Sequence, residues 1–202
     1  MSQQPDVTPS PETGAEYSQE ERHLLLKLAH DAIDAALRHQ EVDTAPPSEH
    51  LAEKRGAFTT LHLHGQLRGC VGYVFAVRPL VRTVAETAVA AAFHDTRFLP
   101  VSEEEAREID IEISVLSPLQ PIAPEDVEVG RHGLVVTLGA RRGLLLPQVP
   151  LEYGWDRETF LAETCHKAGL PGDAWEHGAT LEAFTAEVFS ELPRPALEHK
   201  TA

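Results

Sequence analysis

The sequence predicts an α+β fold in which helices pack against an antiparallel sheet. Residues 18–38 and 79–93 repeat apolar side chains at helical spacing, whereas residues 109–115 alternate apolar and polar side chains as a half-buried strand does. Residues 57–72 have the pattern of a hairpin, and the later strands do not alternate regularly with helices. A parallel sheet needs that alternation, so we expect the antiparallel arrangement.

Length and charge restrict the class of protein. The chain has 202 residues, which is enough for one domain with a sizeable core. Its formal charge is −15, and a field of this sign repels phosphate backbones, so we expect no nucleic-acid partner. No apolar run approaches the roughly 20 residues that cross a bilayer, so we expect no membrane partner. Only two cysteines are present, which suits a reducing, cytoplasmic location.

The two ends of the chain differ in composition from its middle. Residues 1–16 are polar and rich in proline, and such a segment cannot bury enough apolar surface to offset its ordering entropy. We therefore expect residues 1–16 to be a disordered tail. Residues 17–192 are expected to form a single domain, and residues 193–202 a frayed tail.

Helix starts are marked by residues that cap free backbone N–H groups or that fit the first turn. Serine with glutamate three residues later forms a capping box, proline suits the first helical position, and aspartate is a favoured N-cap. The signals are Ser18 with Glu21 for the helix over 18–38, Pro79 for 79–93, Ser102 with Glu105 for a short acidic helix, and Asp156 for 157–168.

Strands are predicted where β-branched and apolar residues lie between turn signals. The first two strands form a hairpin whose bend falls at either His64-Gly65 or Gly65-Gln66, and a slip of one residue would exchange the faces of the strand. His62 and His64 share a face in this pattern but have no evident partners, so we expect no metal site. Later strands are expected over residues 134–138, 144–147 and 181–189.

Residues 67–72, with the sequence LRGCVG, hold a thiol, a cation and two glycines. In an extended segment Arg68 and Cys70 share one face, and a guanidinium near sulfur favours the thiolate, which is the nucleophilic form. Glycines such as Gly69 leave bare backbone where a ligand or another chain approaches. The alternative is that Cys70 is a small buried side chain with a structural role, as many free cysteines are.

The LRGCVG run resembles the signature of the AMMECR family, also known in prokaryotes as AmmeMemoRadiSam system protein A. The similarity continues through residues 18 to 190 in the order of the family, and Val71 stands where the family often has isoleucine. The further similar segments are 58–61, 91–98, 111–116, 132–134, 143–149, 154–155 and 165–170.

This resemblance implies an α+β fold with a smaller lobe that forms one wall of a cleft. It also places Asp95 and Arg97 beside the Cys70 strand, whereas the residues alone indicate a local ion pair at a helix end. Glu112 and Ser114 would line the same cleft instead of facing solvent. Relatives are encoded or fused with Memo-like proteins and radical S-adenosylmethionine proteins, so these are the implied partners, although the family has no securely assigned reaction.

Two functions follow as hypotheses. In the first, the protein is a cysteine-centred enzyme or pathway component acting on an unknown small molecule. Cys70 is then the nucleophile, and Glu112 or His132 is the general base or acid. Substrate binding is assigned to Arg68, Gly69, Asp95, Arg97, Ser114 and Gln148. In the second, the same cleft is a non-catalytic ligand- or partner-binding module. Neither the residues nor the resemblance names a cofactor.

Overall fold

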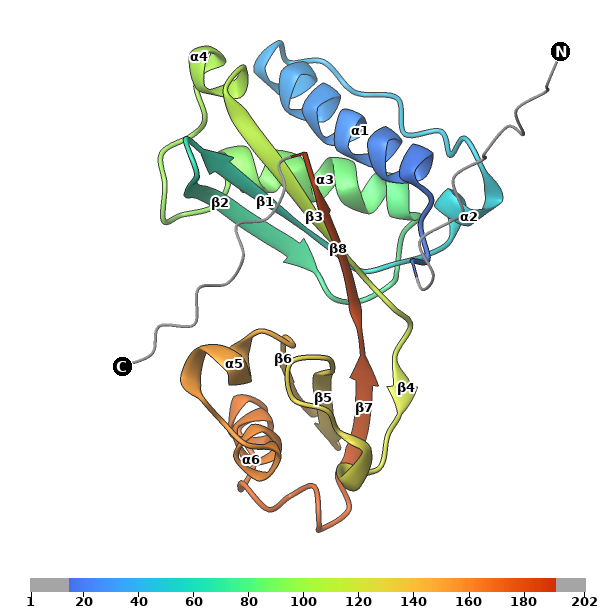
Figure 1. Cartoon of the computed structure of the whole chain (residues 1–202), viewed down its shortest axis with the longest axis vertical. Helices are drawn as coiled ribbons and strands as arrows, with labels where there is room; N and C mark the ends of the chain where they lie inside the picture. The colour runs from blue at the N-terminus through green and yellow to red at the C-terminus, as the bar shows by residue number, and fades with distance from the viewer. Residues whose placement is uncertain (1–14, 192–202) are drawn as a thin grey trace, which may run out of the picture.

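Strands that are distant in the sequence meet in two four-stranded antiparallel sheets (Figure 1). The structure is a computed structural model and describes residues 15–191. The strand order is β2-β1-β3-β8 in the first sheet and β4-β7-β5-β6 in the second. The strands are β1 Ala57–Leu63, β2 Gln66–Tyr73, β3 Ile109–Leu116, β4 Gln120–Pro121, β5 Gly133–Leu138, β6 Arg141–Leu145, β7 Thr180–Phe184 and β8 Ala186–Ser190.

Helix starts agree with the capping signals of the sequence. Both serine–glutamate capping boxes form, and the Asp156 side chain accepts a hydrogen bond from the backbone N–H of Thr159. Pro79 lies at the N-cap position, one residue before the helix that it was expected to begin. The helices are α1 Gln19–Leu37, α2 Glu49–Ala52, α3 Leu80–Phe93, α4 Glu103–Ala106, the 3-10 turn η1 Pro124–Asp126, α5 Val149–Tyr153 and α6 Arg157–Lys167.

In the first lobe, α1 and α3 cover one face of the sheet (Figure 1). Alternate residues of the central strands, including Leu61, Ile111 and Ile113, are fully buried against Leu25 of α1 and Val84 of α3. Each such side chain contributes roughly 1.5–3 kcal/mol when it leaves water. The opposite face, which we call the open face, carries the polar residues of the same strands.

The second lobe packs α6 against its sheet around Leu134, Phe160 and Leu161. The chain passes between the lobes twice, from β3 to β4 and from β7 to β8, so the single strand expected over residues 181–189 is divided between the two sheets. At this crossing the Ser117 N–H donates to the Thr185 carbonyl at 2.9 Å, and the Thr185 N–H donates to Ser117 Oγ at 2.9 Å. These two bonds hold the connecting segments together.

The first hairpin bends at His64-Gly65, since Leu63 pairs with Gln66 across the turn. Both turn residues have positive φ, as a two-residue hairpin turn of the primed type requires. The register shifts close to the turn, because His62 pairs with Leu67 whereas Leu61 pairs with Gly69. Arg68 is therefore the extra residue of a β-bulge.

Glu16, the last residue of the expected tail, makes contacts with the domain. The Glu16 N–H donates to Glu187, and the Glu16 carboxylate pairs with Arg55, whose side chain is 8% exposed. The expectations for residues 1–14 and 192–202 concern segments outside the described residues. Among residues 15–191, no helix combines the length and the apolar character needed to cross a membrane.

Gly69 gives a test of this packing. A Cβ atom at this position would overlap the carbonyl oxygen of Ala91 in α3, because β2 and α3 are in close contact there. Overpacking of this kind costs about 1–3 kcal/mol. We predict that Gly69→Ala lowers the free energy of unfolding by about that amount, measured by urea denaturation, whereas Gln66→Ala at the exposed start of the same strand changes it by less than about 0.5 kcal/mol. Equal stabilities would contradict the close contact.

Candidate active site around Cys70

Four polar residues form a row across the open face of the first sheet. Cys70 of β2 pairs with Thr60 of β1, Thr60 pairs with Glu112 of β3, and Glu112 pairs with Ser190 of β8. Residues that pair directly across an antiparallel sheet project to the same face. All four are half-buried. A thiol, a hydroxyl, a carboxylate and a second hydroxyl thus lie side by side on one surface.

The sulfur of Cys70 has a hydroxyl donor. Thr60 Oγ1 donates a hydrogen bond to Cys70 Sγ at 3.3 Å. This hydrogen bond holds the hydroxyl beside the sulfur on the open face. Thr60 was not expected as a site residue, although its position between the buried residues Thr59 and Leu61 marks it as facing the open side.

The outer edge of β2 is held by Asp95 and Arg97. β2 is an edge strand, so the outward backbone groups of Cys70 have no neighbouring strand. The Cys70 N–H donates to Asp95 Oδ2 at 2.9 Å, and Arg97 Nη2 donates to the Cys70 carbonyl at 3.5 Å. Arg97 also binds both Asp95 oxygens, at 3.0 and 2.7 Å. The two side chains thereby replace a missing strand at this residue.

These bonds determine the charge state of Asp95. The Arg97 guanidinium, followed by the Cys70 N–H, holds the pKa of the Asp95 carboxyl far below its usual range. The hydrogen bond to Asp95 likewise raises the pKa of Arg97. The Asp95 side chain is only 6% exposed, whereas that of Arg97 is 56% exposed. The pair is therefore anchored on the aspartate side and open to solvent on the arginine side.

The guanidinium of Arg68 is paired with a carboxylate of α4. Its Nε and Nη2 atoms bind the two carboxylate oxygens of Glu105 at 3.0 and 2.9 Å, and the guanidinium lies 5.9 Å from the centre of the Phe98 ring. The positive charge of Arg68, which was expected to favour a Cys70 thiolate, is therefore paired with the Glu105 carboxylate. The bulge at Arg68 also places Leu67 opposite His62, so Leu67 does not share the inner face of Gly69 as simple alternation predicted.

The other expected site residues divide between the lobes. Ser114 lies on the open face, in the row next to that of Cys70, and Gly69 faces α3 instead of a ligand. His132 is half-buried in the loop before β5, where its Nδ1 accepts a hydrogen bond from the Glu128 N–H at 3.1 Å. Gln148 is exposed at the N-cap of α5. Both of these belong to the second lobe.

The second lobe nonetheless borders the Cys70 row. Phe58 lies over Gly72 on the open face and packs with Val135, Phe184 and Leu144 of the second lobe. Phe58 and Thr60 are two residues apart on one strand, so their rows are separated by about 6.5 Å. The contact between the lobes therefore lies next to the row that contains the thiol.

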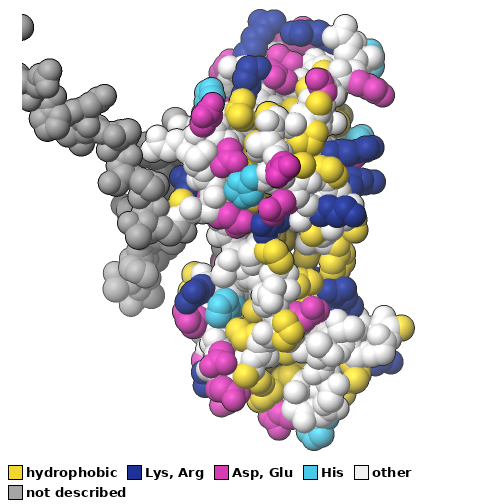
Figure 2. Space-filling model, turned by 90° about the vertical axis from the view of Figure 1, so that its right-hand side faces the viewer, with side chains coloured by type: hydrophobic (Ala, Val, Ile, Leu, Met, Phe, Trp, Pro, Cys, Tyr) yellow, Lys and Arg dark blue, Asp and Glu magenta, His cyan; other side chains and the backbone are white. Residues whose placement is uncertain are grey.

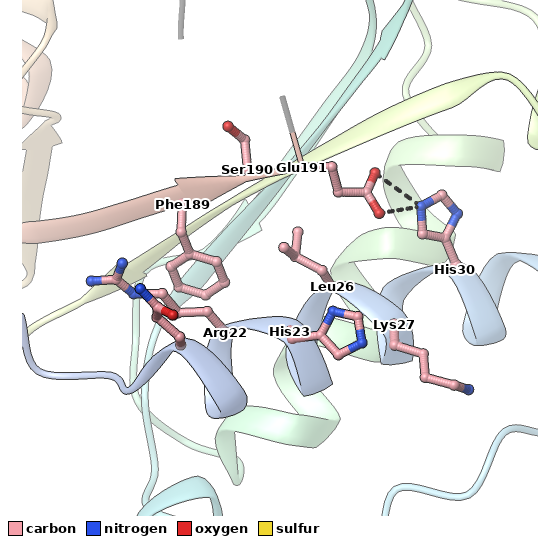
Figure 3. Close-up of a pocket in the computed structure, with 9 residues that line it drawn as sticks. Arg22, His23, Leu26, Lys27, His30, Phe189, Ser190 and Glu191 are labelled. Atoms are coloured by element: carbon pink, nitrogen blue, oxygen red, sulfur yellow. Dashed lines mark hydrogen bonds and ion pairs between the residues drawn. The ribbon is translucent and has the colours of Figure 1, made fainter. Parts of the chain in front are cut away.

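A separate cavity of about 720 Å³ lies between α1 and β8 (Figure 3). Its lining includes Arg22, His23 and Lys27 of α1, and His30 Nε2 lies 2.9 and 3.1 Å from the two Glu191 carboxylate oxygens. β8 and β2 are opposite edges of the sheet, so this cavity lies at the far end of the row from Cys70, where Ser190 also lines it. Within residues 15–191, no three His, Cys, Asp or Glu side chains are grouped so that they would hold a metal ion.

Comparison with known proteins identifies the family. The AMMECR1 family model matches residues 26–189. The chain belongs to the AMMECR1 family. Among its relatives, protein TK0174 of Thermococcus kodakarensis is 43% identical over 192 residues, covering 87% of this chain and 93% of the relative. Protein MK0488 of Methanopyrus kandleri is 43% identical over 190 residues, covering 88% and 92%.

A solved structure from this family supports the same fold. The crystal structure of the uncharacterised protein PH0010 from Pyrococcus horikoshii aligns with a TM-score of 0.69 at 43% identity, covering 83% of this chain and 90% of that one. The α+β fold predicted from the sequence is confirmed. The AMMECR1 assignment supplies no reaction, so the activity has to be argued from the site.

The Asp95 carboxylate leads to a prediction about pH. Its pKa is lower in the folded protein than the usual value of about 3.9 in an unfolded chain, so its stabilising effect is fully present above that value and is lost as the pH falls through the folded pKa. Asp95→Asn should lower the melting temperature at pH 7, because a charge-assisted hydrogen bond contributes about 1.5–3 kcal/mol. The difference in melting temperature between Asp95→Asn and the wild type should become smaller below about pH 4, as measured by thermal unfolding.

Asp31→Asn is a matched control for this experiment. Asp31 forms an ion pair with Lys27 on the exposed face of α1, where such pairs contribute at most about 1 kcal/mol. Its melting temperature should stay close to that of the wild type at both pH values. An Asp95→Asn difference that does not narrow on acidification would show that the charge of Asp95 does not secure the edge of β2.

Proposed function

We propose that this AMMECR1 protein is a cysteine-centred enzyme that acts on a small molecule at the open face of the first sheet. The observation that carries the proposal is the row formed by Cys70, Thr60 and Glu112. The thiol and the carboxylate face the same way and are separated by two strand spacings, or about 9–10 Å between Cα atoms. A small substrate lying over Thr60 would therefore reach both groups.

In this proposal Cys70 is the nucleophile. Its sulfur forms a bond to an electrophilic carbonyl carbon of the substrate, and the π electrons of the carbonyl move onto its oxygen. The proton of the thiol passes through the Glu112 carboxylate to that oxygen, so the addition needs no oxidant or reductant. Thr60 holds the sulfur through its hydroxyl, and Asp95 with Arg97 fixes the backbone that carries it. In this proposal Arg97 and Ser114 contact the substrate.

We place this reaction in a pathway with a Memo-like protein and a radical S-adenosylmethionine protein. The support is membership of the AMMECR1 family, together with the partners that the resemblance in the sequence implies. A pathway that includes a radical enzyme modifies small molecules or protein side chains through reactive intermediates. A half-buried thiol in the row beside the contact between the lobes would suit a step on such a product.

A second candidate function is a non-catalytic ligand-binding module on the same face. It is favoured by the ion pair between Arg68 and Glu105, because this pair removes the cation expected to activate Cys70. In this case Thr60, Glu112 and Ser114 would hydrogen-bond a polar ligand and Cys70 would only pack against it. The reactivity of the thiol separates the two candidates.

Limited alkylation tests the role of Cys70. With substoichiometric iodoacetamide near neutral pH, Cys70 should react at least about tenfold faster than Cys165, as measured by mass spectrometry of tryptic peptides. Cys165 is fully buried, and burial raises the pKa of its thiol. Thr60→Val should slow the reaction of Cys70 several-fold, because the hydroxyl donor to sulfur is lost.

Three controls make the result specific. Thr60→Ser keeps the hydroxyl and should react like the wild type, and Arg68→Met should change the rate by less than about twofold, because Glu105 already takes up its charge. Glutathione under the same conditions gives the rate of an ordinary thiol. A Cys70 rate at or below that of glutathione, unchanged in Thr60→Val, would refute the nucleophile and leave the binding module.

A further inference from the structure

The connection between β2 and α3 is an exposed apolar segment. Residues 73–77 have the sequence YVFAV, and the exposed fractions of Tyr73, Phe75 and Val77 are 36, 45 and 64%. Loops in water are usually polar, and a run of exposed apolar residues is unfavourable unless another molecule covers it. The site around Cys70 does not use these side chains, so the segment calls for a separate explanation.

Cations surround this segment. The Arg142 guanidinium lies 4.3 Å from the centre of the Phe75 ring, and that of Arg78 lies 6.0 Å from the centre of the Tyr73 ring. Arg78 and Arg82 share one carboxylate, Glu86, at 2.6 and 2.9 Å. Lys54 is exposed, and its backbone pairs with Pro79 directly after the segment.

We call these seven residues the loop patch: Lys54, Tyr73, Phe75, Val77, Arg78, Arg82 and Arg142. Its four cations face two carboxylates, Glu86 and Glu182, so it is locally positive on a chain with a net charge of −15. Figure 2 shows hydrophobic side chains at the waist between the lobes with Lys and Arg side chains above and below them on the same side. Aromatic residues and arginine are also the types enriched where proteins bind partners.

We infer that the loop patch is a docking surface for an acidic segment of a partner protein that inserts an apolar side chain beside Phe75 and Val77. Charge complementarity selects the acidic partner, and the apolar run selects an apolar anchor within it. A short segment meets only charges within the screening length of about 8 Å, which here are mainly cations. A nucleic acid or an anionic membrane extends further and would also meet the acidic remainder of the surface.

The loop patch lies beside both the Cys70 strand and the second lobe. β2 leads directly from Cys70 to Tyr73, and Phe75 of the first lobe lies against Arg142 of the second. A partner bound here would contact both lobes and lie beside the open face. This inference stands whether or not Cys70 is a nucleophile, because it depends only on the exposed segment and its surrounding cations.

Fluorescence anisotropy with the full-length protein tests the docking. The probe is a short fluorescein-labelled peptide in which a Leu-Phe pair is flanked by aspartates and glutamates. It should bind with a Kd below about 1 mM, and the Kd should rise as salt is added. A peptide with Ser-Ser in place of Leu-Phe should bind about tenfold more weakly, since the apolar anchor is lost. Amide hydrogen exchange should show protection of residues 74–78 when the probe is bound.

Variants locate the binding site of the probe. Val77→Ser and Arg142→Gln should each weaken binding about tenfold. Leu151→Ser is the matched control, because Leu151 is 56% exposed on α5 and lies outside the patch, and its affinity should equal that of the wild type. Circular dichroism and thermal melting confirm that each variant is folded.

Three outcomes would overturn the inference. The first is an absence of binding up to about 1 mM peptide. The second is equal affinity of the wild type and both patch variants. The third is tighter binding of duplex RNA or of phosphatidylserine vesicles than of the peptide, with loss in the patch variants, which would assign the patch to another class of partner.

Discussion

The hydrogen bond from the Cys70 N–H to the Asp95 carboxylate sets the position of the whole candidate site. An edge strand exposes backbone groups that would otherwise be hydrated or would pair with another chain. At Cys70 these groups are met by Asp95 and Arg97, which the end of α3 supplies. The buried α3 helix is thus coupled to the thiol through one carboxylate, and a shift of either element would move the other.

The LRGCVG segment divides its functions among individual residues. Gly69 permits contact with α3, and Gly72 lies beneath the Phe58 ring, so the two glycines serve packing on opposite faces of β2. Arg68 joins the strand to α4 through Glu105. Cys70 is the residue of the motif that presents a reactive group to the row of Thr60 and Glu112. The other residues of the motif therefore act mainly by fixing the position of β2 against α3, α4 and Phe58.

The two lobes share a small apolar junction, and both surfaces with a proposed role border it. The row of Phe58 belongs to that junction and is adjacent to the row of Cys70. Phe75 of the first lobe also lies against Arg142 of the second. Within residues 15–191, two backbone segments cross between the lobes, so the geometry of the junction determines how a ligand on the open face and a partner on the loop patch are placed relative to each other.

The sequence alone determined the local structure and the family. The capping boxes, the alternation of β3, the His64-Gly65 turn as one of two options and the α+β class all follow from interactions within a few residues. It also singled out Cys70 through the LRGCVG run, and the resemblance to the family added Asp95, Arg97, Glu112 and Ser114. Only the tertiary structure decided that Glu105 takes up the charge of Arg68, that Thr60 donates to the sulfur, and that His132 and Gln148 belong to the second lobe. Periodicity shows which face a side chain occupies, but not which distant strand or helix lies beside it, because that is fixed by the pairing register and packing of the whole chain.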